Sequence, residues 1–162
     1  MSSPSSGLPT VDVLGVSIHD VSRQELLARL ERGVCFTPNV DFIMRMRRDA
    51  EFRRIFHQAD FRICDSRIVQ LAARFLGTPI REKISGSDFF GEYCAHHRDN
   101  PEVRVFLLGA MPGVAEEARR RVNQRIGREI IVDTRSPPFG FENDEAECSA
   151  IIEQVNRSGA TV

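Results

Sequence analysis

A chain of 162 residues is long enough for one domain with a substantial buried core. Its 41% hydrophobic and 28% charged residues are typical of a soluble globular protein, and a net charge of −1 gives no overall attraction to nucleic acid. The opening residues MSSPSSGLPT lack the basic and apolar segments of a secretory signal, and no run approaches the ~18 apolar residues of a transmembrane helix. We therefore expect a cytoplasmic protein without a nucleic-acid partner.

Apolar patterning predicts that strands and helices alternate along the chain after a disordered Ser/Pro-rich leader at residues 1–10. The predicted strands are short apolar runs: 11–18 (as strands or a hairpin), 34–38, 61–64, 103–109 and 129–133. The predicted helices are amphipathic segments with capping residues: 22–33, about 41–57, 66–76, 85–97, 112–127 (with Pro112 near its first position) and 144–156. The run at 103–109 is nearly continuous in apolar residues, which favours burial on both faces.

Strands that alternate with crossover helices are typical of an α/β fold, here a doubly wound, mostly parallel, Rossmann-like sheet with helices on both faces. We expect a single α/β domain over 11–162. The alternation predicts another strand at the end, and Ala160, Thr161 and Val162 look like its first residues. We therefore expect the C-terminal part of this domain to lie beyond Val162.

The four cysteines lie far apart and form no C-x-x-C pair: Cys35, Cys64, Cys94 and Cys148. Cys35 and Cys64 fall in apolar strand-like runs, where a buried free thiol is the expected state. Free thiols fit a reducing compartment.

Candidate binding residues follow from a general property of open parallel sheets, which bind ligands at the carboxyl ends of their strands. Helix N-termini at that edge carry free N–H groups that suit phosphate, so a phosphorylated or nucleotide ligand is expected. Four segments hold this position: TPNVD (37–41), DSR (65–67), GAMPG (109–113) and TRSPPFG (134–140).

Asp65 stands where a predicted strand ends and a predicted helix begins. Its structural interpretation is the cap of that helix, and its functional interpretation is a carboxylate that faces the ligand. The two need not exclude each other, because Ser66 can serve as the cap and leave Asp65 free.

The other segments also have two interpretations each. Thr37 and Asn39 fit helix capping about as well as ligand binding. Gly109 and Gly113 fit an ordinary tight turn as well as a diphosphate cradle, since the segment is neither G-x-G-x-x-G nor a Walker A sequence. The stretch REKISGSDFF (81–90) fits a solvated loop with an N-cap better than a cationic edge, on composition alone.

Metal ligands are not evident in the sequence. His96 and His97 are adjacent, so on a helix they point in different directions, and no nearby Cys or paired carboxylates complete a site. The D-x-D pair of many sugar-nucleotide enzymes is missing. Neither a metal nor another cofactor is expected. The Arg-rich helix within 42–56 fits a solvated face better than a membrane surface, because Asp49 and Glu51 interrupt its charge.

Five segments, in this order along the chain, resemble the WecG/TagA/CpsF family of bacterial glycosyltransferases: TPNVDF, ADFRICDSRIV, REKISGSDFF, VFLLGAMPGVAEEA, and SPPFGF followed by DEAE. The resemblance covers nearly all of 11–162. It implies an inverting, metal-independent enzyme that transfers a sugar from a UDP-sugar to a polyprenyl-diphosphate-linked saccharide in cell-envelope or exopolysaccharide biosynthesis. It also implies a position at the inner face of the cell membrane, and a homo-oligomer is left open.

The resemblance also implies roles for residues. A single inverting displacement needs a general base, and the resemblance places that base at Asp65 with Thr37 in the same pocket. It places the following residues at the donor or at the border of its pocket: Asn39, Ser66, Lys83, Gly86, Asp88, Gly109, Gly113, Pro138, Phe139 and Gly140.

Three features depart from the family pattern. Ser66 replaces the usual Gly and leaves less room for a ligand, and Lys83 replaces a common Arg, which keeps the charge without the bidentate fork. The family continues through a Val-Gly-x-Gly-x-Pro-Lys-Gln-Glu motif into an appendage associated with membrane contact, beyond Val162. The alternatives are a non-catalytic nucleotide-binding module and a scaffold domain of a polysaccharide assembly complex.

Overall fold

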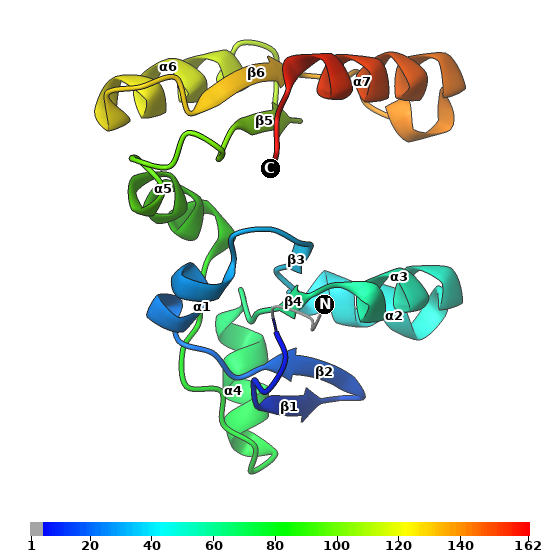
Figure 1. The fold of residues 1–162 in the computed structure, drawn as a ribbon. Coiled ribbons are helices and arrows are strands. Elements are labelled where there is room, and N and C mark those ends of the chain that lie inside the picture. Colours follow the sequence, from blue (N-terminus) through cyan, green and yellow to red (C-terminus); the bar gives the residue numbers. More distant parts are fainter. Residues whose placement is uncertain (1–4) are drawn as a thin grey trace. The chain divides into compact units, whose positions relative to one another are not determined.

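The computed structural model describes residues 5–162, which divide into two compact units, one up to Phe90 and one from Gly91 on (Figure 1). The α/β class is confirmed, because the described residues form seven α-helices and three two-stranded sheets, two of them parallel. The predicted doubly wound sheet differs from these three separate pairs and stays a prediction, as does the single domain over 11–162. Each unit is described by itself below.

The first unit begins with the predicted hairpin. Strands β1 (Thr10–Val13) and β2 (Val16–His19) pair antiparallel through a two-residue turn, Leu14-Gly15. Both turn residues have positive φ, 57° and 82°, as the right-handed twist of a tight hairpin favours. Of the predicted disordered leader, Met1 to Pro4 lie outside the described residues, residues 5–8 form a hydrogen-bonded turn, and Thr10 already belongs to β1.

Helix α1 (Arg23–Arg29) begins with a capping box. The Ser22 hydroxyl accepts the N–H of Glu25 at 3.3 Å, and the Glu25 carboxylate accepts the N–H of Ser22 at 2.8 Å. The helix ends at Leu30, so the predicted end at Gly33 is wrong by about one turn.

The predicted helix over about 41–57 is two helices, α2 (Val40–Arg48) and α3 (Ala50–Gln58). Asp49 takes an extended conformation between them, and its carboxylate caps α3 by accepting the N–H of Phe52 at 2.8 Å. The break brings the rings of Phe42 and Phe52 to 5.4 Å from each other, whereas ten residues of continuous helix would separate them by about 15 Å. Both rings also pack on Phe36, so aromatic contacts stabilise the break.

Strands β3 (Cys35–Phe36) and β4 (Phe61–Arg62) pair in parallel at the centre of this unit. Helix α4 (Arg67–Phe75) follows β4, with Ser66 as its N-cap, and buries Val69 and Ala73 in the core. The core shared by the hairpin, α2, α3 and α4 consists of apolar side chains: Val13, Val16, Ile18, Ile43, Met46, Phe56, Cys64, Val69, Ala73 and Ile80. Helix α5 (Gly86–His96) spans the boundary between the units.

The second unit holds the parallel pair β5 (Val105–Leu108) and β6 (Ile131–Arg135), with α6 (Val114–Ile126) between them in the chain (Figure 1). Helix α7 (Glu145–Ser158) follows a short 3₁₀ turn, Phe141–Asn143, and is capped by Asp144. The predicted burial of the β5 segment on both faces holds for Val105 but is wrong at Leu108, which is 49% exposed.

Both ends of α6 are glycines with positive φ. Gly127 ends the helix as predicted, but the N-cap is Gly113, so Pro112 lies before the cap and not at the first helical position. At the chain's end, the Val162 N–H donates to the Arg104 carbonyl at 3.1 Å and the Val162 carbonyl accepts the Phe106 N–H at 2.8 Å. These two bonds follow the pattern of a parallel ladder, but residues 160–162 form no strand, so the strand expected here stays a prediction.

Candidate active site

Three segments of the first unit meet at the carboxyl end of the β3–β4 pair. The Asp65 N–H donates to the Pro38 carbonyl at 3.3 Å, which places the segments after β3 and β4 side by side. The Ile84 N–H donates to the Cys64 carbonyl at 2.9 Å and brings in the segment that leads to α5. The predicted ligand edge, at the carboxyl ends of the parallel strands, is therefore formed here by these three segments.

Side chains converge around the Asp65 carboxylate. One of its oxygens, Oδ2, accepts the N–H of Gly86 at 3.3 Å, and the other lies 4.0 Å from Lys83 Nζ. A Cβ added at Gly86 would lie 3.3 Å from Thr37 Cγ2, 3.6 Å from Thr37 Oγ1 and 3.8 Å from Asp65 Oδ2. Thr37, Asp65, Lys83 and Gly86 are therefore neighbours, although up to 49 residues separate them in the chain.

The surroundings of Asp65 leave it accessible to a ligand. Its side chain is 28% exposed and that of Lys83 is 33% exposed. A separation of 4.0 Å is too long for a hydrogen bond, and within residues 5–162 no hydrogen bond uses the Lys83 ammonium. The ammonium thus keeps its N–H donors for an anionic ligand while it remains close to the carboxylate.

The interpretation of Asp65 as the cap of the helix that follows it is wrong. Ser66 caps α4, because its hydroxyl accepts the Val69 N–H at 3.3 Å. Asp65 instead interacts with Gly86, the first residue of α5, where the free amides of a helix N-terminus favour a negative charge. The carboxylate is fixed by a helix far along the chain and not by its own.

Cys64 lies directly before Asp65 but is not a nucleophile. Its side chain is buried, and this burial raises the pKa of the thiol. Its Sγ donates to the Ser66 carbonyl at 3.3 Å. The thiol is therefore held neutral, and neutral thiols are poor nucleophiles. Burial also raises the pKa of Cys35 to about 12 and that of Cys94 to about 11. The expected buried free thiol is confirmed for Cys64, whereas Cys35 is free but only half-buried.

Asn39 and Asp88 lie in the first unit at helix starts. Asn39 caps α2, because its Oδ1 accepts the Phe42 N–H at 3.1 Å, so its structural interpretation is confirmed. Asp88 lies in the first turn of α5 and is exposed. Roles of these two side chains at a ligand stay predictions.

The remaining predicted residues belong to the second unit, where two loops lie side by side. Gly109 has a φ of 113°, and its carbonyl accepts the Ser136 hydroxyl at 3.3 Å, which ties the loop after β5 to the loop after β6. Gly113 begins α6 without a side-chain cap, so the first amides of this helix have no side-chain acceptor. In the second loop, Pro138 and Phe139 are exposed, and Gly140 has a positive φ of 83°.

The comparison with protein families agrees with these segments. The model of the glycosyl transferase WecG/TagA/CpsF family matches residues 11–162, almost the whole chain. The chain belongs to this family. A search of curated proteins found no significant match. Family membership makes the chain a glycosyltransferase of cell-envelope polysaccharide synthesis, which acts on a sugar donor and an acceptor.

Two further properties of the glycosyltransferase concern metals and membranes. Within residues 5–162, no three His, Cys, Asp or Glu side chains gather as a metal site would require. In the same part of the chain, every helix is too short or too polar to cross a bilayer.

Sequence reasoning missed the residue that supports the second loop of the glycosyltransferase. Arg135, at the end of β6, forms a bidentate pair with Glu147, with 2.9 Å from Nη2 to each carboxylate oxygen, and also donates to Gln154 at 2.9 Å. The pair fixes α7 against the strand from which the loop 136–140 leaves. The partners Glu147 and Gln154 lie 12 and 19 residues after Arg135 in the chain, and no local sequence pattern indicates these contacts.

Proposed function

We propose that this glycosyltransferase is inverting and metal-independent, and that it moves a sugar from a UDP-sugar to a polyprenyl-diphosphate-linked saccharide. Its products enter cell-envelope or exopolysaccharide biosynthesis, and it works as a peripheral protein at the inner face of the cell membrane. The resemblance of five ordered segments to the family supports this choice of donor and acceptor. The doubly wound, Rossmann-like sheet also stays a proposal, which the parallel pairing within each unit supports.

The observation that carries the proposal is the convergence of Thr37, Asp65, Lys83 and Gly86 at the carboxyl edge of β3–β4. It joins an accessible carboxylate, a hydroxyl, a cation and a helix N-terminus within one small site. An inverting transfer needs this set: a base for the acceptor and positive groups for the leaving diphosphate.

In the proposed reaction, the acceptor hydroxyl attacks the anomeric carbon of the donor as the bond from that carbon to the UDP oxygen breaks. Asp65 takes the hydroxyl proton while the new C–O bond forms, and UDP leaves with the electron pair of the broken bond. Thr37 Oγ1 and Asp65 Oδ2 both lie within 4 Å of the position that a Gly86 Cβ would take, and in the proposal Thr37 orients the acceptor hydroxyl. The Lys83 ammonium and the first amides of α5 stabilise the negative charge that develops on the diphosphate.

Other residues have supporting roles in the proposal. Asn39, Ser66 and Asp88 lie at the helix starts around this edge and contact the donor. Gly109, Gly113 and the loop Pro138, Phe139 and Gly140 are proposed donor contacts of the second unit, with an exposed aromatic ring that suits stacking on a base.

The test is Asp65→Asn in the complete protein, assayed for transfer from a UDP-sugar to a polyprenyl-diphosphate-linked acceptor. Asparagine keeps the shape of the side chain and its acceptor for the Gly86 N–H, but it cannot take a proton. We expect the transfer rate to fall by roughly 10²–10⁴-fold, with unchanged UDP affinity in calorimetry. Asp99→Asn, an exposed carboxylate of the second unit, is the matched control and should transfer normally.

Near-normal transfer by Asp65→Asn would overturn the assignment of the base. Binding of NAD but not UDP would overturn the donor class. UDP binding without any transfer by the complete wild-type protein would favour a non-catalytic nucleotide-binding module instead.

A further inference from the structure

The outer face of α4 exposes an apolar stripe. Ile68, Leu71 and Phe75 are 68%, 59% and 92% exposed, and their spacing of three and four residues puts them on one side of the helix. Val69 and Ala73, on the other side, are buried in the core of the first unit. The helix is therefore apolar on both sides, and packing within its own unit explains only one of them.

The charges beside this stripe are all positive. Arg67 and Arg74 are the only charged residues of α4, and both are exposed. Arg67 donates to the neutral Gln70 amide oxygen at 3.3 Å, and within residues 5–162 no carboxylate pairs with Arg74. Other exposed arginines, such as Arg47 and Arg125, also form no ion pair within residues 5–162, so it is the position of Arg67 and Arg74 beside the apolar stripe that distinguishes them.

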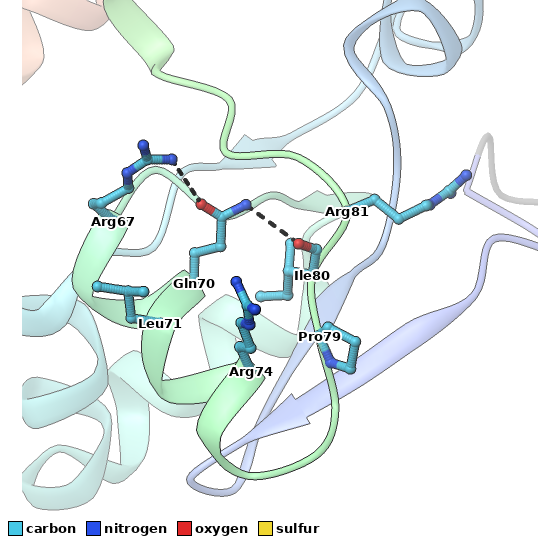
Figure 2. A pocket seen from close by; sticks show the side chains of 7 residues that line it. All are labelled: Arg67, Gln70, Leu71, Arg74, Pro79, Ile80 and Arg81. Carbon is cyan, nitrogen blue, oxygen red and sulfur yellow. Dashed lines mark hydrogen bonds between the residues drawn. The ribbon is translucent and has the colours of Figure 1, made fainter.

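A groove lies beside the stripe and shares Leu71 with it. It has a volume of about 590 Å³ and lies between α4 and the segment 79–81; its lining residues are Arg67, Gln70, Leu71, Arg74, Pro79, Ile80 and Arg81 (Figure 2). Gln70 fixes its wall by donating to the Ile80 carbonyl at 3.2 Å. Arg81 is held by Asp20 and Glu25, so Arg67 and Arg74 supply the positive charge that the groove offers.

An anionic bilayer matches this combination of groups. A helix that lies in a membrane interface inserts a narrow apolar face and sets its cations among the lipid phosphates. A purely apolar partner would leave Arg67 and Arg74 buried without counter-charges, whereas an acidic peptide alone would leave the Phe75 ring without apolar surroundings. Arg67 and Arg74 both line the groove beside the stripe, which offers a phosphate headgroup room next to positive charge.

We propose that the outer face of α4 docks this chain on an anionic phospholipid bilayer, with Ile68, Leu71 and Phe75 in the acyl boundary and Arg67 and Arg74 on lipid phosphates. The inference rests on the proposed function, because it assigns the contact by which the enzyme reaches a lipid-linked acceptor. Asp65 directly precedes the N-cap of α4, so docking brings the proposed base to the bilayer surface.

The test is co-flotation of the complete protein with phosphatidylcholine vesicles, with and without phosphatidylglycerol. We expect binding only to the anionic vesicles. The double variant Leu71→Ser/Phe75→Ser should lower the partition coefficient by roughly tenfold or more, because two large apolar side chains no longer insert. Arg67→Gln and Arg74→Gln should each lower it about fivefold.

Matched controls use exposed residues of the second unit. Ile152→Ser removes an isoleucine that is 61% exposed, and Arg125→Gln removes an exposed arginine from the last turn of α6; neither should change vesicle binding. Far-ultraviolet circular dichroism and UDP calorimetry establish that each variant is folded and binds its donor.

Undiminished vesicle binding by Leu71→Ser/Phe75→Ser would overturn the inference while leaving the proposed function intact. The inference would also be overturned if the wild type sediments as a dimer and does not bind vesicles, while the same variant sediments as a monomer. In that case the face of α4 contacts a second copy of the chain. If the wild type does not bind UDP, by contrast, the proposed function is refuted and the lipid contact is not.

Discussion

Acidification should weaken the fold through His19, at the contact between β2 and β4. His19 is 5% exposed, and its Nδ1 accepts the N–H of Arg62 at 3.0 Å. A backbone N–H can only donate, so the neutral ring carries its proton on Nε2. Burial, and next the nearby Arg62 guanidinium, lower the pKa of His19 from 6.5 to about 4. Protonation at Nδ1 would remove the acceptor and set two positive charges side by side.

The sign and size of the effect follow from linkage. Between pH 6.5 and about 4 the unfolded chain binds a proton at His19 that the folded chain does not, so stability is complete above this window and falls as the pH falls through it. A difference of this size corresponds to about 3 kcal/mol at the acidic end, of which about 2 kcal/mol is lost by pH 5. The carboxylates with lowered pKa, such as Asp49 and Glu25, contribute only below about pH 4.5.

The assay is urea unfolding at pH 7 and pH 5, followed by circular dichroism. We expect the wild-type midpoint to fall by about 1 M between these values, given the usual denaturant dependence of small domains. His19→Asn supplies an acceptor at the place of Nδ1 but does not titrate, so most of this fall should disappear. An equal fall in wild type and His19→Asn would refute the reasoning.

Two further substitutions test the site and the second unit. Gly86→Ala puts a methyl group 3.3 Å from Thr37 Cγ2 and should lower the transfer rate about tenfold, while the unfolding free energy changes by less than about 1 kcal/mol. Gly91→Ala, which has open space in the same helix, is the control and should transfer normally. Equal losses of transfer in both variants would contradict the proposed crowding. The Asn123 side chain bonds both the N–H and the carbonyl of Ile131, the first residue of β6, at 2.9 Å, so Asn123→Ala should lower the unfolding free energy measured in urea by about 2 kcal/mol. Gln124→Ala, at the neighbouring position, should lower it by less than about 0.5 kcal/mol. An equal loss in both variants would contradict this role of Asn123.

The order of elements and most helix starts could be predicted from the sequence, because they depend on side chains a few residues apart. Ser22 with Glu25, Ser66 and Asp144 satisfy the first amides of their own helices, and Gly127 ends α6 within the same turn. Such bonds form in any tertiary surroundings, so local patterns indicate them reliably.

Features that depend on distant contacts were predicted poorly. The apolar periodicity over 41–57 continues through Asp49 and predicts one helix. The contacts of Phe42 and Phe52 with Phe36, in strand β3, favour two helices instead. The bidentate pair of Arg135 and Glu147 likewise has no local signal, because its geometry depends on how α7 packs on β6.

The candidate site combines both kinds of information. The sequence by itself determined that Asp65 follows a strand, that Ser66 can cap the next helix, and that ordered segments match a glycosyltransferase family. Only the tertiary structure decided which groups surround the carboxylate: the Gly86 N–H at 3.3 Å and Lys83 at 4.0 Å. The physical reason is that capping bonds join near neighbours in the chain, whereas the partners of Asp65 come from a segment about twenty residues later, which reaches it only when α5 is set against the β3–β4 edge.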